Sequence, residues 1–233
     1  MLVGWWCSVT VVVRKERSDK GTVRLTSRDV EVMGWVGEQY GVRIDVVARL
    51  LGGWCEENGW KDGVLGERRT RRVIERWSMA GLADYRKVLY GEPGWVWLTR
   101  KGLREVGIEA KFWEPKAAML RHTHMASVVR LRTEVRFPEA KWRGERAIRA
   151  GRQEGRFTPD GELILGERLI AIEVELTAKA PKRIHEIVAY HAHDYAETWY
   201  FATGQALTSV VSARSRLELD RQERIKVFDL EAL

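Results

Sequence analysis

Residues 158–177 read TPDGELILGERLIAIEVELT, and this stretch decides the fold of the second half of the chain. Two apolar runs flank Gly166 and Glu167, a two-residue connection of the kind that closes a β-hairpin. Such a turn sets Leu165 opposite Arg168. Because side chains alternate between the two faces of a strand, one face of the hairpin is continuously apolar and needs a core. That face consists of Leu163, Leu165, Ile170, Ile172, Val174 and Leu176.

The opposite face of this hairpin brings three carboxylates together. Counting back along both strands from the turn places Asp160 opposite Glu173, and alternation adds Glu175 to the same side. Like charges that face each other across a ladder repel, and a divalent cation is the usual way to relieve the repulsion. We therefore expect Mg²⁺ or Mn²⁺ to be held by Asp160, Glu173 and Glu175, with the Val174 carbonyl as a further oxygen. Such a cation would lower the pKa of a bound water and stabilise charge at a phosphodiester under attack.

Two lysines follow the acidic residues. Lys179 and Lys182 come after the last strand of the hairpin, at the mouth of the next expected helix, where either could reach a phosphate. Lys179 joins the three carboxylates as an expected catalytic residue. The alternative interpretation is an amphipathic hairpin with a solvated acidic face and a Pro-Asp-Gly turn.

The segments around the hairpin alternate between helical and strand patterns. The expected helices cover 117–135, 181–195 and 205–217, and the expected strands cover 141–148, 156–165, 168–177, 198–202 and 224–228. This order predicts an α/β domain with a small central mixed sheet over residues 117–233. We expect this domain to fold on its own, because the pattern changes across residues 108–116, which read as a linker.

The first half of the chain has a different pattern. Three helices are expected, from Thr26 or Ser27 to Gly41, over 44–51, and from about Glu67 to Gly81, followed by two short strands within 82–98 and a helical tail over 101–106. Helix, helix, helix and hairpin is the order of a winged helix-turn-helix domain, which we assign to residues 24–107. Residues 1–23 form an N-terminal extension. The whole chain is therefore expected to be α+β.

The third expected helix is basic on one face. Its apolar positions leave four guanidinium groups on the opposite side, at Arg68, Arg71, Arg72 and Arg76. Residues 66–104 contain ten Lys or Arg against four Asp or Glu. We expect this helix to enter the major groove of duplex DNA, with phosphate contacts from Arg86, Lys87, Arg100 and Lys101 on or beside the wing. The alternative is a basic, solvated helix in a generic helical bundle.

Composition narrows the class of protein. The 233 residues carry a formal net charge of +7, which favours anionic partners. Only Cys7 and Cys55 are present, so neither a disulfide framework nor a zinc motif is expected, and a cytoplasmic location fits best. The opening residues 1–13 are apolar but lack a basic leading region and a cleavage signal, and they are too short to span a bilayer. No membrane association is expected.

The histidines and tryptophans are weaker candidates. Because side chains two residues apart on a helix diverge, His122 and His124 are interpreted as packing or polar contacts rather than a metal pair. His191 is expected in the core, and His193 is expected to face water. Eleven tryptophans are present, and those expected in loops or the wing could stack on unpaired bases: Trp54, Trp60 and Trp95.

The acidic pattern resembles that of the PD-(D/E)XK nuclease superfamily. Pro159-Asp160 is followed after twelve residues by Glu173-Val174-Glu175, within helix, three strands, helix and strand. The family motif ends in lysine, and here Glu175 stands in its place. In some members the lysine lies on the following helix, a position that Lys179 or Lys182 would fill. Glu145, in Trp142-Arg-Gly-Glu145, is a candidate additional ligand, although a surface carboxylate is an equally good interpretation.

The combined layout is similar to that of the replication-relaxation family of actinobacterial plasmids and mobile elements. The similarity covers residues 24–200 and is carried by the expected winged helix with WLTRKGL at 97–103, His124 and Val128, Trp142 and Glu145, and the segments at 159–161 and 173–177. It implies a role in the replication or topology of plasmid or element DNA.

These features predict a DNA-binding protein with a metal-dependent, nuclease-like domain. One alternative is a non-catalytic transcriptional or replication regulator. Its degenerate nuclease fold would then serve to form a homodimer or to bind a partner. Another is a structural adaptor for a replisome or partition complex. Metal binding that depends on Asp160 would separate the first interpretation from the others.

Overall fold

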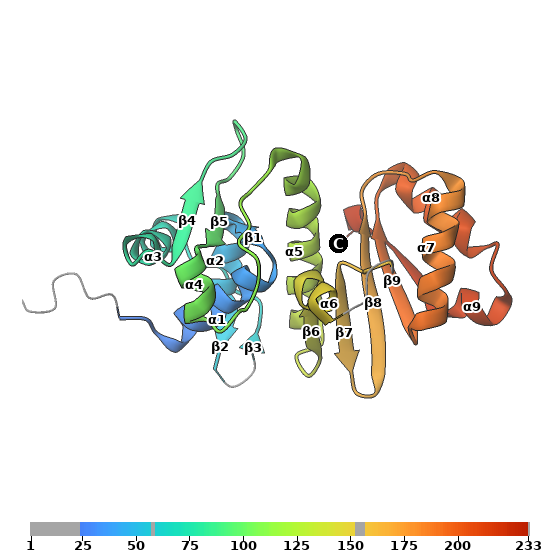
Figure 1. Cartoon of the computed structure of the whole chain (residues 1–233), viewed down its shortest axis with the longest axis horizontal. Helices are drawn as coiled ribbons and strands as arrows, with labels where there is room; N and C mark the ends of the chain where they lie inside the picture. Colours follow the sequence, from blue (N-terminus) through green and yellow to red (C-terminus); the bar gives the residue numbers. More distant parts are fainter. Residues whose placement is uncertain (1–23, 57–58, 152–156, 233) are drawn as a thin grey trace, which may run out of the picture.

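The computed structural model describes residues 24–56, 59–151 and 157–232 (Figure 1). The expected extension over residues 1–23 lies outside the described part of the chain. In the first half, the helices are α1 (Ser27–Glu38), α2 (Ile44–Gly53), α3 (Glu67–Met79) and α4 (Arg100–Glu105). The strands are β1 (Gly41–Arg43), β2 (Trp54–Cys55), β3 (Gly59–Trp60), β4 (Ala83–Arg86) and β5 (Trp95–Leu98).

The first helix begins where the sequence predicts and ends earlier than expected. The Thr26 hydroxyl accepts a hydrogen bond from the Asp29 amide, and the Asp29 carboxylate accepts one from the Thr26 amide, which makes a capping box. The helix ends at Glu38 rather than at Gly41, and Tyr40 takes a positive φ of 69°. The chain then turns into β1, which pairs with β5 in an antiparallel sheet of order β1-β5-β4.

The second half contains a five-stranded sheet. Its helices are α5 (Ala117–Arg136), α6 (Glu145–Gly151), α7 (Pro181–Asp194), α8 (Gly204–Arg214) and α9 (Leu219–Arg224), followed by a short 3-10 turn at Leu230–Ala232. Its strands are β6 (Lys141–Gly144), β7 (Gly161–Leu165), β8 (Arg168–Glu175), β9 (Glu197–Ala202) and β10 (Ile225–Asp229). The order is β10-β9-β8-β7-β6, antiparallel from β6 to β8 and parallel from β8 to β10, so the sheet is mixed as predicted.

The predicted hairpin turn is confirmed. Leu165 pairs with Arg168 across Gly166 and Glu167, and the register runs back to Gly161 opposite Ile172. Gly166 has a positive φ of 61°, a conformation that glycine adopts without strain. The paired strands are shorter than expected, because β7 begins only at Gly161 and β8 ends at Glu175.

The prediction of one strand over residues 141–148 is wrong. The strand β6 ends at Gly144, and α6 begins at Glu145. Glu145 and Arg149 form an ion pair of 2.6 Å one helical turn apart, and Ile148 is buried. These contacts stabilise the segment as an amphipathic helix rather than as the expected strand. The β2–β3 hairpin and α9 were also not predicted, since both are too short to show a clear period.

Helices cover both faces of the mixed sheet (Figure 1). On one face Ala126 and Val129 of α5 pack against Leu163, Ile170 and Ile172. On the other face Ile184 and Val188 of α7 and Val210 of α8 pack against Tyr200 and Ile225. Among the described residues, no helix is both long enough and apolar enough to cross a membrane.

The long helix α5 joins the two halves of the chain. Its Leu131 belongs to the core of the first half, while Val129 belongs to the core beneath the sheet. Arg130 is buried and forms an ion pair of 2.6 Å with Glu38, and the indole of Trp35 donates a hydrogen bond of 2.6 Å to Glu134. In Figure 1, α5 accordingly stands between the first half and the sheet.

Candidate functional site

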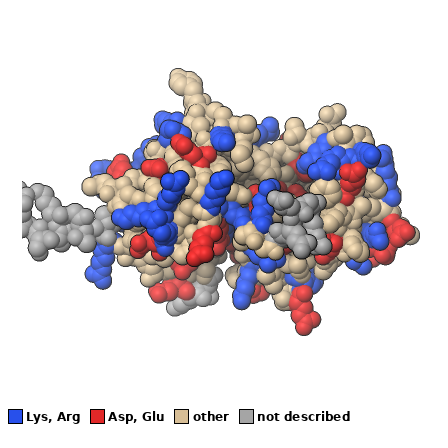
Figure 2. All heavy atoms as spheres, in the orientation of Figure 1, with Lys and Arg blue, Asp and Glu red and all other residues tan. Residues whose placement is uncertain are grey.

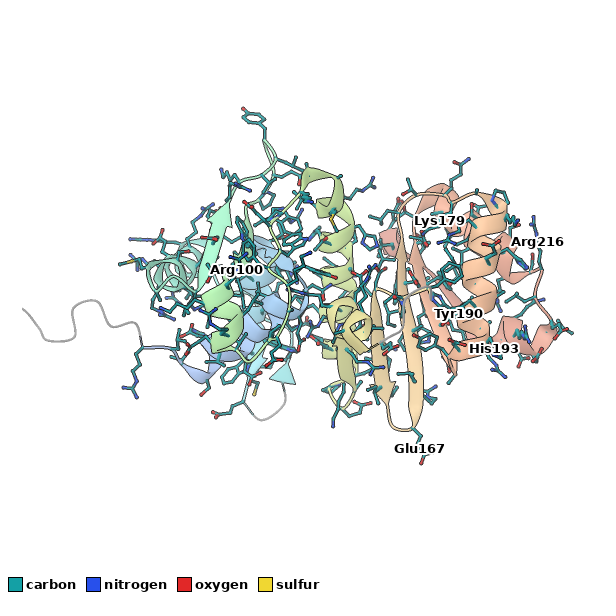
Figure 3. All side chains as sticks on the ribbon, viewed as in Figure 1. Arg100, Glu167, Lys179, Tyr190, His193 and Arg216 are labelled. Carbon is teal, nitrogen blue, oxygen red and sulfur yellow. The ribbon has the colours of Figure 1, made fainter. Side chains whose placement is uncertain are left out.

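The three acidic residues predicted from the hairpin lie at one end of the sheet. Asp160 directly precedes β7, and its Oδ2 accepts a hydrogen bond of 2.8 Å from the Val174 amide. This bond confirms that Asp160 reaches the neighbourhood of Glu173. The side chains of Glu173 and Glu175 are both buried, with residue exposures of 9% and 3%. Figure 3 shows Lys179 at the opposite end of the sheet from Glu167, so the acidic residues lie far from the hairpin turn.

The electrostatics of this end of the sheet favour a positive charge. Burial and the negative charges of Asp160 and Glu175 raise the pKa of Glu173 well above its usual value. Burial also raises the pKa of Glu175, although Lys179 opposes the rise. The Lys179 ammonium donates a hydrogen bond to Glu175 Oε1 from four residues further along the chain. A carboxylate whose pKa is raised by burial and like charges binds either a proton or a cation.

His122 is a site residue that the sequence interpretation missed. Its Nε2 lies 3.2 Å from Asp160 Oδ2 and 3.1 Å from the Val174 carbonyl oxygen. The hydrogen bond with Asp160 raises the pKa of His122 to about 9, so the imidazole is protonated at neutral pH. The interpretation of His122 as a polar contact was correct in kind but did not place it in the site. Its position on the sheet-facing side of α5 is the feature from which its place in the site could have been predicted.

His124 has the opposite environment. It lines the side of α5 that faces Arg43 and Asp45, which confirms that residues two apart on this helix diverge. Burial and the positive charge of Arg43 lower the pKa of His124 to about 4, so its imidazole is neutral at ordinary pH. His122 and His124 do not form a metal pair.

A second histidine contacts the acidic residues from α7. His191 is fully buried, as predicted; its Nδ1 lies 3.0 Å from the Tyr200 hydroxyl, and its Nε2 lies 3.6 Å from Glu173 Oε1. Burial and the charge of Glu173 raise the pKa of Tyr200 well above its usual value. His193 is exposed, as expected. The sequence predicted the burial of His191 but not its contact with Glu173.

Two further candidates lie at the edge of the site. The Glu145 amide donates to the Asp160 carbonyl oxygen at 3.2 Å, but the Glu145 carboxylate pairs with Arg149. Lys182 is exposed in the first turn of α7. Lys and Arg side chains gather over the upper ends of α7 and α8 in Figure 2, the region where Figure 3 labels Lys179 and Arg216. Anionic substrates would meet positive charge on this side of the acidic residues.

The chemistry of the donor set fits a hard divalent cation. Asp160, Glu173 and Glu175 offer the carboxylate oxygens that Mg²⁺ and Mn²⁺ prefer. Among the described residues, however, no three His, Cys, Asp or Glu side chains stand close enough to form a ready-made metal centre. His122 already contacts Asp160 Oδ2 and the Val174 carbonyl, two of the oxygens expected to face a cation. Binding of a cation at these carboxylates would therefore require the His122 side chain to move.

The arginines of α3 fall into two groups. Arg68 and Arg72 are exposed and form no ion pair with another described residue. Arg71 instead binds Glu67 at 2.8 Å and the Tyr85 hydroxyl at 3.1 Å. Arg76 binds the fully buried Asp29 at 2.6 Å. Two of the four predicted guanidinium groups are thus held by contacts within the protein, while Arg69, which the sequence interpretation left out, is exposed.

The cations on and beside the β4–β5 hairpin also make internal contacts. Arg86 pairs with Glu114 at 3.0 Å, and Arg100 lies 5.6 Å from the Phe112 ring centroid. The Lys101 ammonium donates to the Ala80 carbonyl at 2.8 Å. Lys87 is exposed.

One of the tryptophans suggested for base stacking is not accessible. Trp95 is 1% exposed, because it pairs with Arg43 and Arg86 in the middle of the three-stranded sheet and packs against Leu120. The suggestion that Trp95 stacks on nucleic acid is therefore wrong. Trp54 and Trp60 are half-buried and pair with each other across β2 and β3.

No family model, curated protein or solved structure matches this chain. The similarity to the replication-relaxation family therefore stays a hypothesis that rests on its short motifs.

Proposed function

We propose that the protein binds DNA through a winged helix in its first half and carries a metal-dependent, nuclease-like domain in its second half. Its process would be the replication or processing of plasmid or mobile-element DNA. The single observation that supports this proposal best is the grouping of Asp160, Glu173 and Glu175 with Lys179 at one end of the mixed sheet. Burying several carboxylates together costs free energy, and a bound cation would offset that cost. This grouping therefore supports a cation-binding role.

Each residue would have a separate role in phosphodiester hydrolysis. Asp160 and Glu173 would hold the cation, and Glu175 would share it or position the attacking water. The bound Mg²⁺ or Mn²⁺ would lower the pKa of that water and stabilise the charge that develops on the phosphate. Lys179 would leave Glu175 to steady the phosphate, since among the described residues its exposed ammonium is paired only with this one carboxylate. His122 would swing away from Asp160 when the cation arrives.

The proposed duplex-binding surface is the exposed part of α3. The chain order of three helices and a hairpin supports a winged helix-turn-helix, in which the third helix enters the major groove. Arg68 and Arg72 carry guanidinium groups that no internal acid neutralises among the described residues. Phosphate contacts from these arginines would give an affinity that falls steeply with salt.

The test of the catalytic proposal is a cleavage assay on supercoiled, relaxed, nicked and single-stranded plasmid DNA, with and without Mn²⁺. Glu173→Gln should abolish metal-dependent cleavage, because it removes a charged ligand while keeping the side-chain shape. The same variant should bind duplex DNA as the wild type does. Glu167→Gln, at the exposed hairpin turn, is the matched control and should cleave normally. Equal behaviour of both variants and the wild type on every DNA form would refute the proposal.

A second candidate function is a non-catalytic regulator that uses this domain for partner binding or dimerisation. The contact of protonated His122 with Asp160 favours it, because an internal cation already neutralises part of the acidic cluster. Calorimetric titration with Mn²⁺ separates the two candidates. Heat of binding that disappears in Asp160→Asn supports the nuclease, and the absence of any binding in the wild type supports the regulator.

A further inference from the structure

A basic cleft of about 720 Å³ lies between the two halves of the chain, away from both proposed sites. One wall is formed by α2 and the residues after β3, and the other wall is formed by α5. The candidate acidic site is on the sheet-facing side of α5, where His122 lies, whereas the cleft is on the other side, where His124 lies. The cleft is thus a separate surface of the molecule.

The walls of the cleft carry a strong excess of positive charge. In the described part of the chain, five cationic side chains line it, against the carboxylates of Asp45 and Asp62. Arg43 is neutralised by Asp45 through an ion pair of 2.6 Å. The other four cations make no ion pair with any described residue, and they are Arg49, Lys61, Arg132 and Arg136. A cleft lined by one sign of charge concentrates counter-ions, so this one attracts an anionic ligand.

The floor of the cleft is aliphatic. Met125, Val128 and Val135 lie on one face of α5 and are half-buried, next to the buried Leu131. The described residues of the lining contain no aromatic ring other than the neutral imidazole of His124. An occupant would therefore meet apolar surface below and cations on both sides, without the stacking platforms that grip individual bases.

We propose that this cleft holds the backbone of a single-stranded segment of nucleic acid. Arg132 and Arg136 are one helical turn apart, a rise of about 6 Å, which is comparable with the spacing of successive phosphates along one strand. Arg49 faces them from the opposite wall, so the strand is gripped from both sides. Sugars rest on the aliphatic floor between the two cationic walls. This site does not depend on the proposed nuclease or on α3.

The experiment measures the binding of a fluorescein-labelled twelve-nucleotide oligo-dT to the full-length protein by anisotropy at several salt concentrations. Arg132→Ala with Arg136→Ala should weaken binding at least tenfold. The double variant should also lower the slope of log affinity against log salt by about 1.4, at about 0.7 for each lost phosphate contact on a single strand. Arg49→Ala, on the other wall, should weaken binding by a smaller factor. Thermal melting checks that each variant is folded.

The matched control removes two arginines of α9, in Arg221→Ala with Arg224→Ala, and should leave oligo-dT affinity unchanged. Equal losses in this control and in the cleft variant would overturn the proposal, because net charge alone would explain them. An oligo-dT affinity that Arg132→Ala with Arg136→Ala does not change would overturn it as well. Binding of a helical peptide of Glu and Leu that depends on Arg132, without binding of oligo-dT, would assign the cleft to an acidic protein partner instead.

Two further variants keep this proposal separate from the proposed function. Arg68→Ala with Arg72→Ala should lose duplex binding but keep oligo-dT binding. Glu173→Gln should lose cleavage and also keep oligo-dT binding. A loss of oligo-dT affinity in either variant would show that the strand binds at α3 or at the acidic site and not in the cleft.

Discussion

His122 and His124 show how strongly position on one helix decides the chemistry of a residue. They are two positions apart on α5, yet the pKa of His122 is raised to about 9 while that of His124 is lowered to about 4. His122 forms a hydrogen bond with the Asp160 carboxylate, which favours the protonated imidazole. Burial and the positive charge of Arg43 disfavour the protonated form of His124. The sequence predicted that the two side chains diverge, but the identity of their partners depends on tertiary contacts, with Asp160 and β8 for His122 and with Arg43 and Asp45 for His124.

The raised pKa of His122 predicts a pH dependence of folding stability. Because its folded pKa exceeds the unfolded value of 6.5, the stabilisation is complete below about pH 6.5 and is lost as the pH rises through about 9. His122→Asn should therefore flatten the decline in the free energy of unfolding between pH 6.5 and pH 9.5. Urea unfolding at several pH values measures this decline.

The neighbouring histidine supplies the control for this measurement. His124 titrates only on the acidic side of pH 6.5, because its folded pKa is about 4. His124→Asn should leave the decline above pH 6.5 as it is in the wild type. An unchanged decline in His122→Asn would mean that another group, and not the contact with Asp160, sets the alkaline behaviour.

At the scale of single elements, α3 carries two kinds of arginine, those that are exposed and those that have partners within the protein. We predict that Arg68→Ala with Arg72→Ala weakens duplex binding and lowers the log–log salt slope by about 1.8, at about 0.9 for each phosphate contact. Melting temperature should change little, because both side chains are exposed. Filter binding or anisotropy at several salt concentrations gives the slope.

Arg76→Ala on the same helix should show the reverse. It leaves the fully buried Asp29 without its cation, although the Thr26 and Trp77 donors remain, so we expect a loss of about 1–3 kcal/mol in the free energy of unfolding. Duplex affinity at a temperature where the variant is folded should stay close to that of the wild type. If Arg76→Ala weakens DNA binding as much as the Arg68 and Arg72 pair does, the division of α3 into two groups is wrong.

The elements that the sequence predicted well are those whose signals are local. A two-residue turn fixes the pairing of Leu165 with Arg168, and that register in turn brings Asp160 to Val174. The α6 helix was not predicted, because the sequence pattern from Glu145 to Ile148 fits either a strand or a helix. Only the burial of Ile148 in the folded protein decides between them. The contacts of His122 and His191 with the acidic residues also escaped, since they join segments that are far apart along the chain.

At the scale of the whole molecule, α5 belongs to two cores at once. Its sheet-facing residues, Ala126 and Val129, complete the core of the second half, and Leu131 completes the core of the first. The same helix carries His122 to the acidic site and lines the basic cleft through Arg132 and Arg136. A shift of α5 would therefore alter the proposed nuclease site and the proposed strand-binding site together.

The shared helix leads to a prediction about independent folding. We expect residues 117–233 to fold alone, because the sheet keeps a hydrophobic core on each face. The melting temperature of this fragment should be lower than that of the full chain. In the fragment Leu131 no longer packs against the first half, and Arg130 has no ion pair with Glu38. In the full chain, Leu131→Ala should cost about 2–5 kcal/mol of unfolding free energy, the usual range for truncating a buried leucine. In the fragment, the same substitution should cost almost nothing, because the side chain is already exposed.

The comparison of two positions on α5 makes this prediction decisive. Val129 faces the sheet and is 1% exposed, so Val129→Ala should destabilise the fragment and the full chain by similar amounts. Leu131→Ala should instead discriminate between them, and urea unfolding of the four variants and their two unsubstituted parents measures both differences. A fragment that does not fold while the full chain does would show that α5 needs the first half to hold its place. The two halves would then form one composite domain, and movement of His122 at the acidic site would be tied to the state of the first half.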